Sequence, residues 1–363
     1  MVKLIFFASR FAPFVGGLET YLTELTSRLV KRGNSVTVVC LNTEEMAACS
    51  MMKGVKVIRL PYKYAIKGKH GVYPILNKRD DDYKRLMKTV DCLKYDYLIT
   101  NTRFNYMSWI GMRYAKKHKI NHIHIEHGNS YLIHPNPIIT LGAFCYDQTI
   151  GRMIMHNAFR VIGISKKCCY FVKKLGVPDD KVGLIYNAVD LNKFQKVKTD
   201  LRKRLGIKQN ARVITYVGRL NYAKGIHHLI NVTRNCTYKV LIVGKGPYLE
   251  QLYKISHENV IFLGEKSQKE IVEILSITNL FVNPSFREGL PTSVLEANAM
   301  GLPIVATDVG GTSEIIDRIL IKPNDPKALD EAIGKAFYRK EKFDWEEKAG
   351  IWDELLNGWW IEE

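Results

Sequence analysis

Two glutamates eight positions apart, Glu288 and Glu296, lie on either side of a glycine turn and the start of an expected helix. Their segment, residues 286–297, reads FREGLPTSVLEA, in which Pro291 suits the first helical position and the two hydroxyl residues after it can satisfy early backbone amides. A helical rise of about 1.5 Å per residue puts the carboxylates about 10 Å apart. That separation suits a grip on two ends of one polar ligand. The amides at the helix start favour a phosphate between the two carboxylates.

Two cations form a second candidate group in the same half of the chain. Arg219 and Lys224 belong to the segment 216–225, YVGRLNYAKG, which follows an apolar run expected to be a strand. Gly218 lets the backbone approach a ligand closely. Two cations at this spacing can straddle a diphosphate, because Arg binds two oxygens at once and Lys acts as a mobile point charge.

A histidine ends an expected strand of the first half, in the sequence Glu126-His127-Gly128-Asn129. Open α/β sheets bind their ligands at the carboxyl ends of their strands. Near neutral pH a histidine can donate a hydrogen bond to a sugar hydroxyl or to a leaving oxygen. We interpret His127 as a candidate ligand contact and Gly128 as leaving room for the ligand. The alternative is a structural histidine.

Three shorter patterns carry weaker signals. The pair Gly16-Gly17 and the segment Gly244-Lys245-Gly246 each follow an expected strand, and tight-turn geometry alone would explain either. The run Asp80 to Asp82 contains an Asp-x-Asp pattern that binds metal-chelated nucleotide sugars in some transferases. Here it lies in a lysine-rich, helical-looking region. We interpret it as a solvated helix start.

The order of apolar runs predicts two successive α/β series. Strands are expected at 2–9, 36–41, 55–60, 97–100, 122–125 and 161–164, and then at 213–217, 239–243, 260–263, 280–283 and 303–307. Helices are expected at 18–32, 80–92, 108–118, 151–157, 166–175, 226–233, 248–256, 268–276 and 292–300, with a helical tail from Pro326.

These motifs carry a family resemblance. The stretch from Glu288 to Glu296, with GLPIVA at 301–306 and GGTSEII at 310–316, resembles the nucleotide-sugar site of retaining glycosyltransferases of family 4. The resemblance covers most of the chain and is strongest over 211–316. It implies the glycosyltransferase B fold, which is an α/β architecture of two Rossmann-like domains facing across a cleft. The expected parts are an acceptor-side domain over 1–190, a nucleotide-sugar domain over 191–340, and a helix over 341–363 that packs back on the first domain.

The resemblance also implies an activity and a set of roles. The activity is retaining transfer of a sugar from a UDP-, GDP- or ADP-sugar to a hydroxyl acceptor. Arg219 and Lys224 would hold the donor diphosphate, Glu288 the sugar hydroxyls, Glu296 the ribose hydroxyls, and His127 would contact the donor sugar. The further donor contacts implied are Gly16, Gly17, Gly218, Gly244, Gly289, Leu290, Pro291 and Thr292. No metal or other cofactor is expected, because the two cations would stabilise the leaving nucleotide.

Charge placement suggests the kind of acceptor. Of the formal net charge of +18, residues 1–200 carry +17 and the remaining residues +1. Such a field attracts anionic partners, although it also serves solubility. The positive charge of the first half predicts a lipid-linked or anionic glycan acceptor. A basic, aromatic region supports this prediction, and it contains Tyr62, Lys63, Tyr64, Lys67, Lys69 and the residues from Lys78 to Lys88. We expect a cytoplasmic protein, in contact with the inner face of an anionic membrane, because no run approaches about 18 uncharged apolar residues.

Two alternatives predict different activities. A sugar-nucleotide epimerase of the same fold would release an altered sugar and need no acceptor. A basic nucleic-acid-binding protein would use the first half and show strongly salt-dependent affinity. The second alternative leaves the paired glutamates and ordered glycine turns of the neutral half unexplained, so no nucleic-acid partner is expected.

Overall fold

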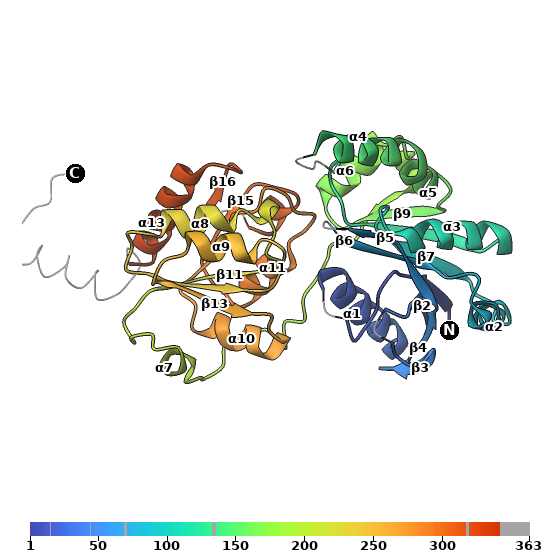
Figure 1. Ribbon diagram of the computed structural model, residues 1–363, viewed down its shortest axis with the longest axis horizontal. Helices are drawn as coiled ribbons and strands as arrows, with labels where there is room; N and C mark the ends of the chain where they lie inside the picture. The colour runs from blue at the N-terminus through green and yellow to red at the C-terminus, as the bar shows by residue number, and fades with distance from the viewer. Residues whose placement is uncertain (15, 44, 69–70, 133–135, 317–318, 342–363) are drawn as a thin grey trace, which may run out of the picture. The chain divides into compact units, whose positions relative to one another are not determined.

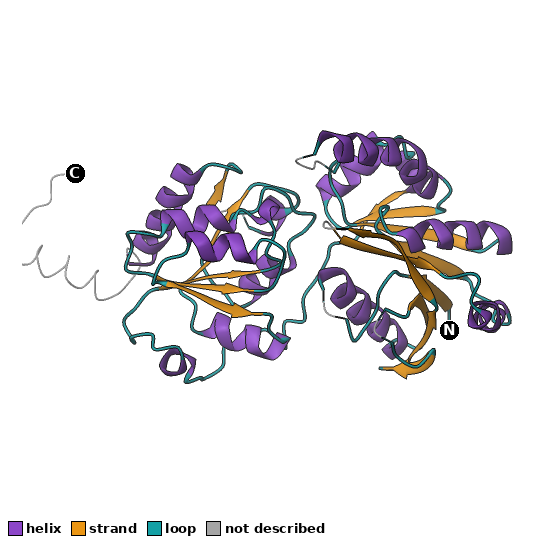
Figure 2. Cartoon of the chain, viewed as in Figure 1, coloured by secondary structure: helices purple, strands orange, loops and turns teal. Residues whose placement is uncertain are grey.

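The computed structural model describes the chain except for residues 15, 44, 69–70, 133–135, 317–318 and 342–363. The chain divides into two compact units, Met1–Asn187 and Ala188–Glu363, and each is built on a mainly parallel sheet covered by helices (Figures 1 and 2). The expected helix over 341–363 lies, from residue 342 on, outside the described residues.

The sheet of the first unit has the strand order β10-β9-β8-β7-β1-β2-β4-β3. Its strands are β1 (Lys3–Phe7), β2 (Ser35–Leu41), β3 (Cys49–Met52), β4 (Val55–Leu60), β7 (Tyr97–Asn101), β8 (Asn121–Glu126), β9 (Arg160–Gly163) and β10 (Val182–Leu184). All neighbours are parallel except β3 and β4, and β5 (Tyr62–Gly68) with β6 (Gly71–Leu76) forms a separate antiparallel hairpin. The apolar run at the start of the chain is the central strand β1, which is buried from Ile5 to Phe7 as its composition requires.

Helices of the first unit cover this sheet. They are α1 (Gly17–Lys31), α2 (Asp81–Asp91), α3 (Tyr106–His118), α4 (Pro137–Tyr146), a π-helical turn η1 (Asp147–Gly151), α5 (Arg152–His156), α6 (Lys166–Lys174) and a 3-10 turn η2 (Asp179–Lys181). The Asp80 side chain accepts a hydrogen bond from the Asp82 amide at 3.0 Å and so caps α2. This confirms that the acidic run is a helix start.

The second unit has the strand order β13-β12-β11-β14-β15-β16. Its strands are β11 (Val213–Val217), β12 (Lys239–Val243), β13 (Val260–Gly264), β14 (Leu280–Asn283), β15 (Ile304–Thr307) and β16 (Ile319–Ile321). Its helices are α7 (Leu201–Arg204), η3 (Tyr222–Lys224, a 3-10 turn), α8 (Ile226–Val232), α9 (Leu249–Ile255), α10 (Gln268–Ser276), α11 (Thr292–Ala299), α12 (Thr312–Ile315) and α13 (Pro326–Glu341). Taken in chain order this is the 3-2-1-4-5-6 arrangement of a Rossmann-like fold.

The strands and helices predicted within the described residues are confirmed to within a few residues, but the prediction was incomplete. It omitted β3, the hairpin of β5 and β6, β10, β16, α4, α7 and α12. Most of these elements are short or lie at a sheet edge. Helix α4 is the exception, since its sequence PIITLGAFCY is apolar on every side and has no helical periodicity to recognise.

Candidate active site

The switch point of the second sheet lies between β11 and β14, because the strand order reverses there. The loop after β11 carries Arg219 and Lys224, and the loop after β14 carries Glu288. Lys224 Nζ lies 2.7 Å from both carboxylate oxygens of Glu288, and both side chains are largely buried, at 22% and 11% exposed. The fold thus joins two residues that the sequence analysis placed on different parts of the ligand.

Two further side chains hold the Glu288 carboxylate. Ser285 Oγ donates to Glu288 Oε1 at 2.7 Å, and Asn283 Nδ2 lies 3.4 Å from the same oxygen. Both come from the end of β14 and the turn after it, so Glu288 has one charged and two neutral donors. A carboxylate held in this way keeps a fixed orientation, which a residue that grips a sugar needs.

The turn η3 is fastened to the loop that carries Glu288. The backbone amide of Phe286 donates to the carbonyl of Ala223 at 2.8 Å. Gly225 has a φ of +63°, and a Cβ there would come within 2.1 Å of the Pro284 carbonyl oxygen, so only glycine fits. The ring of Tyr222 stands 5.6 Å from that of Phe286. These contacts set the distance between Lys224 and Glu288.

Arg219 differs from Lys224. Its side chain is exposed and, among the residues that the structure describes, its guanidinium has no ion-pair partner. Gly218 and Gly244 lie next to it, where the loops after β11 and β12 meet. A Cβ on Gly244 would come within 1.9 Å of the Gly218 carbonyl oxygen. Gly244 therefore has a packing role, and Lys245 beside it forms an ion pair with Glu265.

Helix α11 carries the second glutamate. It begins at Thr292, so Pro291 is its N-cap and does not occupy the first helical position as predicted; the proline side chain makes no capping hydrogen bond. The Glu296 carboxylate has no hydrogen-bond partner in the described part of the chain. Burial raises the pKa of Glu296 to about 7.

The remaining predicted donor contacts surround the start of α11. Leu290 and Pro291 are buried, so a ligand would meet the Leu290 backbone and not its side chain. The Gly311 amide donates to the Gly289 carbonyl at 2.6 Å, and Gly310, with a φ of +57°, packs on the carbonyl of Glu288. The GGTSEII segment therefore packs on and supports the loop that carries Glu288.

In the first unit the switch point lies between β1 and β7. The glycine pair Gly16-Gly17 leads from the β1 loop into α1, and a Cβ on Gly17 would meet nothing within 4 Å. One turn into α1, the ring of Tyr21 packs edge-on against His127, with 4.9 Å between ring centroids. The fold thus brings the glycine pair and the histidine to the same end of one sheet.

His127 is partly buried and neutral at physiological pH. Burial lowers its pKa, as does nearby His124, while Glu126 raises it, and the result is about 4. Its Nε2 lies 3.3 Å from Oδ1 of Asn101, at the end of β7. The Nδ2 atom of Asn101 is buried and has no partner within the described residues. A polar atom left in that state next to His127 is a candidate ligand contact that sequence reasoning missed.

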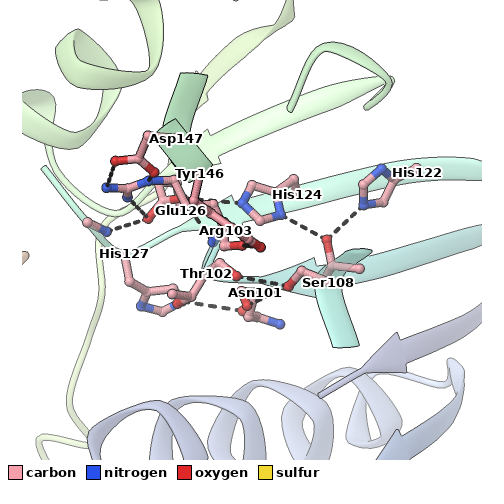
Figure 3. Close-up of polar contacts among 12 residues, drawn as sticks. Asn101, Thr102, Arg103, Ser108, His122, His124, Glu126, His127, Tyr146 and Asp147 are labelled. Carbon is pink, nitrogen blue, oxygen red and sulfur yellow. Dashed lines mark hydrogen bonds and ion pairs between the residues drawn. The ribbon is translucent and has the colours of Figure 1, made fainter. Parts of the chain in front are cut away.

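Behind His127 lies a buried ionic cluster (Figure 3). Arg103 Nε donates to Asp147 Oδ1 at 2.6 Å, and Arg103 Nη1 donates to Glu126 Oε1 at 3.0 Å. All three side chains are at most 2% exposed. Further contacts come from His124 Nε2 to Glu126 Oε2 at 3.3 Å, and from the Gly128 amide to Glu126 Oε1 at 2.6 Å. The cluster fixes the strand end that carries His127.

The electrostatics of this cluster follow from its pairing. Burial alone would raise the pKa of Glu126, but the Arg103 guanidinium and the donors from His124 and Gly128 lower it to about 2. Burial raises the pKa of Asp147, which Arg103 only partly offsets. The prediction that Gly128 leaves room for a ligand was wrong. A Cβ on Gly128 would come within 2.5 Å of Arg103 Nη1, so the guanidinium already occupies the space beside this glycine.

Sequence reasoning missed Arg103 and Asp147 altogether. Strand β7 ends at Asn101, and Arg103 follows it by two residues. This position just after a predicted strand was the signal that could have identified Arg103 as a candidate. Asp147 lies 44 residues further along, in a π-helical turn that no local pattern announces. Within the residues that the structure describes, no cluster of three or more His, Cys, Asp or Glu side chains could hold a metal ion. No described helix is long and apolar enough to cross a membrane.

Solved structures of the same architecture cover nearly the whole chain. Sucrose-phosphate synthase from Thermosynechococcus elongatus superimposes with a TM-score of 0.76 at 20% identity, covering 93% of this chain and 90% of that one. The Anabaena protein HepE, solved with UDP-glucose, superimposes with a TM-score of 0.74 at 20% identity, covering 94% and 91%. The two parallel-sheet units thus define the glycosyltransferase B fold.

Sequence comparison specifies the family. The family model described as "Glycosyltransferase Family 4" matches residues 15–193, and that described as "Glycosyl transferases group 1" matches residues 197–349. The chain belongs to the family 4 glycosyltransferases. An uncharacterized glycosyltransferase of Methanocaldococcus jannaschii is 26% identical over 98% of this chain and 99% of its own length. An Escherichia coli UDP-Gal:alpha-D-GlcNAc-diphosphoundecaprenol alpha-1,3-galactosyltransferase is 32% identical over 53% of this chain and 52% of its own.

Proposed function

We propose that this glycosyltransferase moves a sugar from a nucleotide-diphosphate sugar to a hydroxyl of a lipid-linked or cell-surface glycan precursor, with retention at the anomeric carbon and without a metal ion. The observation that carries the proposal is the contact of Lys224 with Glu288 at the switch point of the second sheet. This contact supports the proposal because a lysine suited to phosphate and a carboxylate suited to sugar hydroxyls lie side by side.

The second unit supplies the donor contacts in this proposal. Arg219, exposed and able to bind two oxygens at once, and Lys224 hold the diphosphate, together with the amides that begin α11. Glu288 accepts hydrogen bonds from sugar hydroxyls while Lys224 turns toward phosphate. Glu296 accepts hydrogen bonds from the ribose hydroxyls, and its carboxylate is partly buried.

The bond between sugar and phosphate breaks as negative charge grows on the leaving diphosphate. Arg219 and Lys224 stabilise that charge, so the step needs no metal ion. The neutral imidazole of His127 accepts a hydrogen bond from a hydroxyl of the donor sugar at Nδ1, because its one N–H, at Nε2, is directed at Asn101 Oδ1. The acceptor hydroxyl attacks the face that the leaving phosphate vacates, its proton passes to a phosphate oxygen, and no protein nucleophile takes part.

The relatives support the choice of donor and acceptor. The E. coli relative is named for UDP-galactose as donor and for a sugar-diphosphoundecaprenol acceptor, and the Anabaena structure contains UDP-glucose. The net charge of +17 over the first 200 residues favours an acceptor that carries a diphosphate.

The test is a panel of UDP-, GDP- and ADP-sugars incubated with the full chain. Nucleotide release is followed with and without a polyprenyl-diphosphate-linked acceptor, and with and without EDTA. The proposal expects acceptor-dependent release that EDTA leaves unchanged, and an α-linked product from an α-linked donor by NMR. Release of an altered free sugar without acceptor would identify an epimerase instead, and an inverted product would exclude retention.

A further inference from the structure

Helix α4 presents an unusual surface. Of its ten residues only Ala143 is buried, and none is charged. Ile138, Leu141 and Phe144, spaced to lie along one side of the helix, are 78%, 62% and 43% exposed. A helix that is apolar on all sides is normally buried in a protein core. An exposed one marks a surface that contacts another apolar phase.

Helix α6 adds positive charge beside this apolar surface. Figure 1 shows α4 and α6 at the same end of the first unit. The ring of Tyr131 lies 5.1 Å from that of Phe144 on α4 and 5.1 Å from that of Phe171 on α6. Lys174 Nζ stands 6.0 Å from the same tyrosine ring. The α6 sequence KKCCYFVKK has four lysines and no acidic residue, so apolar and basic groups are contiguous.

We propose that α4, with the Lys174 side of α6, docks the protein on an anionic phospholipid bilayer. Apolar side chains enter the boundary between headgroups and acyl chains, and Lys174 faces the anionic headgroups. The inference rests on the proposed function, because a lipid-linked acceptor is presented at such a surface.

The surface is fastened to the strand end that carries His127. Tyr146, the last residue of α4, donates from Oη to the Arg103 carbonyl at 2.9 Å. Asp147, the next residue, pairs with the Arg103 guanidinium, which in turn holds Glu126 beside His127 (Figure 3). A bilayer that holds α4 therefore also fixes the height of His127 above the lipid.

Two other occupants are outcomes of the test. A second copy of this chain bound through the same face would set the α6 lysines of both copies against each other. The acidic segment 342–363 would be attracted by the same lysines.

The experiment measures co-sedimentation of the full chain with vesicles of phosphatidylglycerol and phosphatidylcholine, or of phosphatidylcholine alone, without donor or acceptor. The wild type is expected to bind the anionic vesicles. The affinity of the double variant Ile138→Asn/Leu141→Asn for these vesicles should fall by about tenfold or more, because two exposed apolar groups no longer enter the bilayer. Its matched control is Met51→Asn, which removes a similarly exposed apolar side chain elsewhere in the first unit and should bind as the wild type.

The charge arm compares Lys174→Glu with Lys117→Glu on α3. Both change the net charge equally, so a contact at α6 predicts about a tenfold loss for the first and a much smaller loss for the second. If both variants lost the same affinity for anionic vesicles, the effect would come from overall charge alone, and the proposal would be overturned.

Three outcomes would also overturn it: unchanged vesicle binding by the α4 variant, a dimer that this variant converts to monomers in light scattering, or faster hydrogen exchange in 342–363 caused by this variant. Nucleotide release in a vesicle-free assay tests the proposed function separately. If a variant lost vesicle binding but still transferred the sugar to a detergent-dispersed acceptor, bilayer docking and sugar transfer would be shown to be separate properties.

Discussion

Lys224 and Glu288, 64 residues apart in the chain, form a two-oxygen ion pair at 2.7 Å where the second sheet reverses its strand order. Each residue neutralises the charge that the proposed function requires the other to use in binding. The pair holds a partly buried lysine and a partly buried carboxylate in defined positions. In the proposed function, phosphate and sugar hydroxyls replace this contact.

The first prediction concerns this pair. Glu288→Gln keeps the shape of the side chain and removes its charge, and it should lower kcat by about 10²- to 10³-fold, the size expected when one preorganised polar contact to the transition state is lost. Lys266→Ala, which breaks the helical pair with Glu270 at 3.0 Å, is the control and should keep full activity. Steady-state kinetics decides, and equal effects of both variants would contradict the role of Glu288.

Glu296 predicts a pH dependence of donor binding. Its folded pKa, about 7, is raised above the ordinary value of 4.5. The stability that its protonated form contributes is therefore complete below pH 4.5 and is lost as pH rises through about 7. Donor binding changes in the opposite sense, because ribose hydroxyls prefer the carboxylate. The donor KM should fall between pH 6 and 8 in the wild type and stay flat in Glu296→Gln. Glu331→Gln on α13 should keep the wild-type slope.

The buried cluster of the first unit predicts a stability effect. Arg103→Met leaves Glu126 and Asp147 buried without their cation, which should lower the free energy of unfolding of this unit by about 3–5 kcal/mol. Arg85→Met removes one member of a surface pair with Asp82, both more than half exposed, and should cost less than about 1 kcal/mol. Denaturant unfolding followed by a first-unit probe distinguishes them, and a similar cost for both would refute the role of the cluster.

The same cluster predicts acid sensitivity. The folded pKa of Glu126 is about 2, below its ordinary value, so its contribution to stability is present above pH 4.5 and lost as pH falls toward 2. Glu126→Gln should flatten the loss of stability over that range. Thermal unfolding at pH values from 2.5 to 5 measures it. A wild-type slope in the variant would show that other carboxylates cause the loss.

Two glycines of the second unit should respond differently to substitution by alanine. Gly244→Ala places a methyl group within 1.9 Å of the Gly218 carbonyl oxygen at a φ of +134°, so the loops after β11 and β12 must separate and donor binding should weaken at least tenfold. Gly334→Ala on α13 meets nothing within 4 Å and should stabilise the second unit by about 0.5–1 kcal/mol. Isothermal calorimetry with UDP and thermal unfolding provide the readouts. Unchanged UDP binding by Gly244→Ala would remove this glycine from the donor site.

The fold was predictable to the extent that its signals are local. Runs such as 213–217 and 239–243 are buried parallel strands, and continuous apolar composition is enough to identify them. The start of the expected helix 292–300 was correct, but Pro291 was assigned to the first helical position and is the N-cap, because proline fits both sides of a helix boundary. Helix α4 was missed because its sequence has no polar side and therefore no helical periodicity.

The sequence by itself determined which residue types follow each strand: the cations after β11, the glutamate after β14 and the histidine after β8. Strand periodicity and glycine placement are properties of neighbouring residues, so they can be read in order. Only the tertiary structure decided that Lys224 contacts Glu288, that Asn101 faces His127 and that Arg103 reaches Asp147. Those contacts depend on which strands become neighbours after long crossovers, and no local pattern encodes that choice.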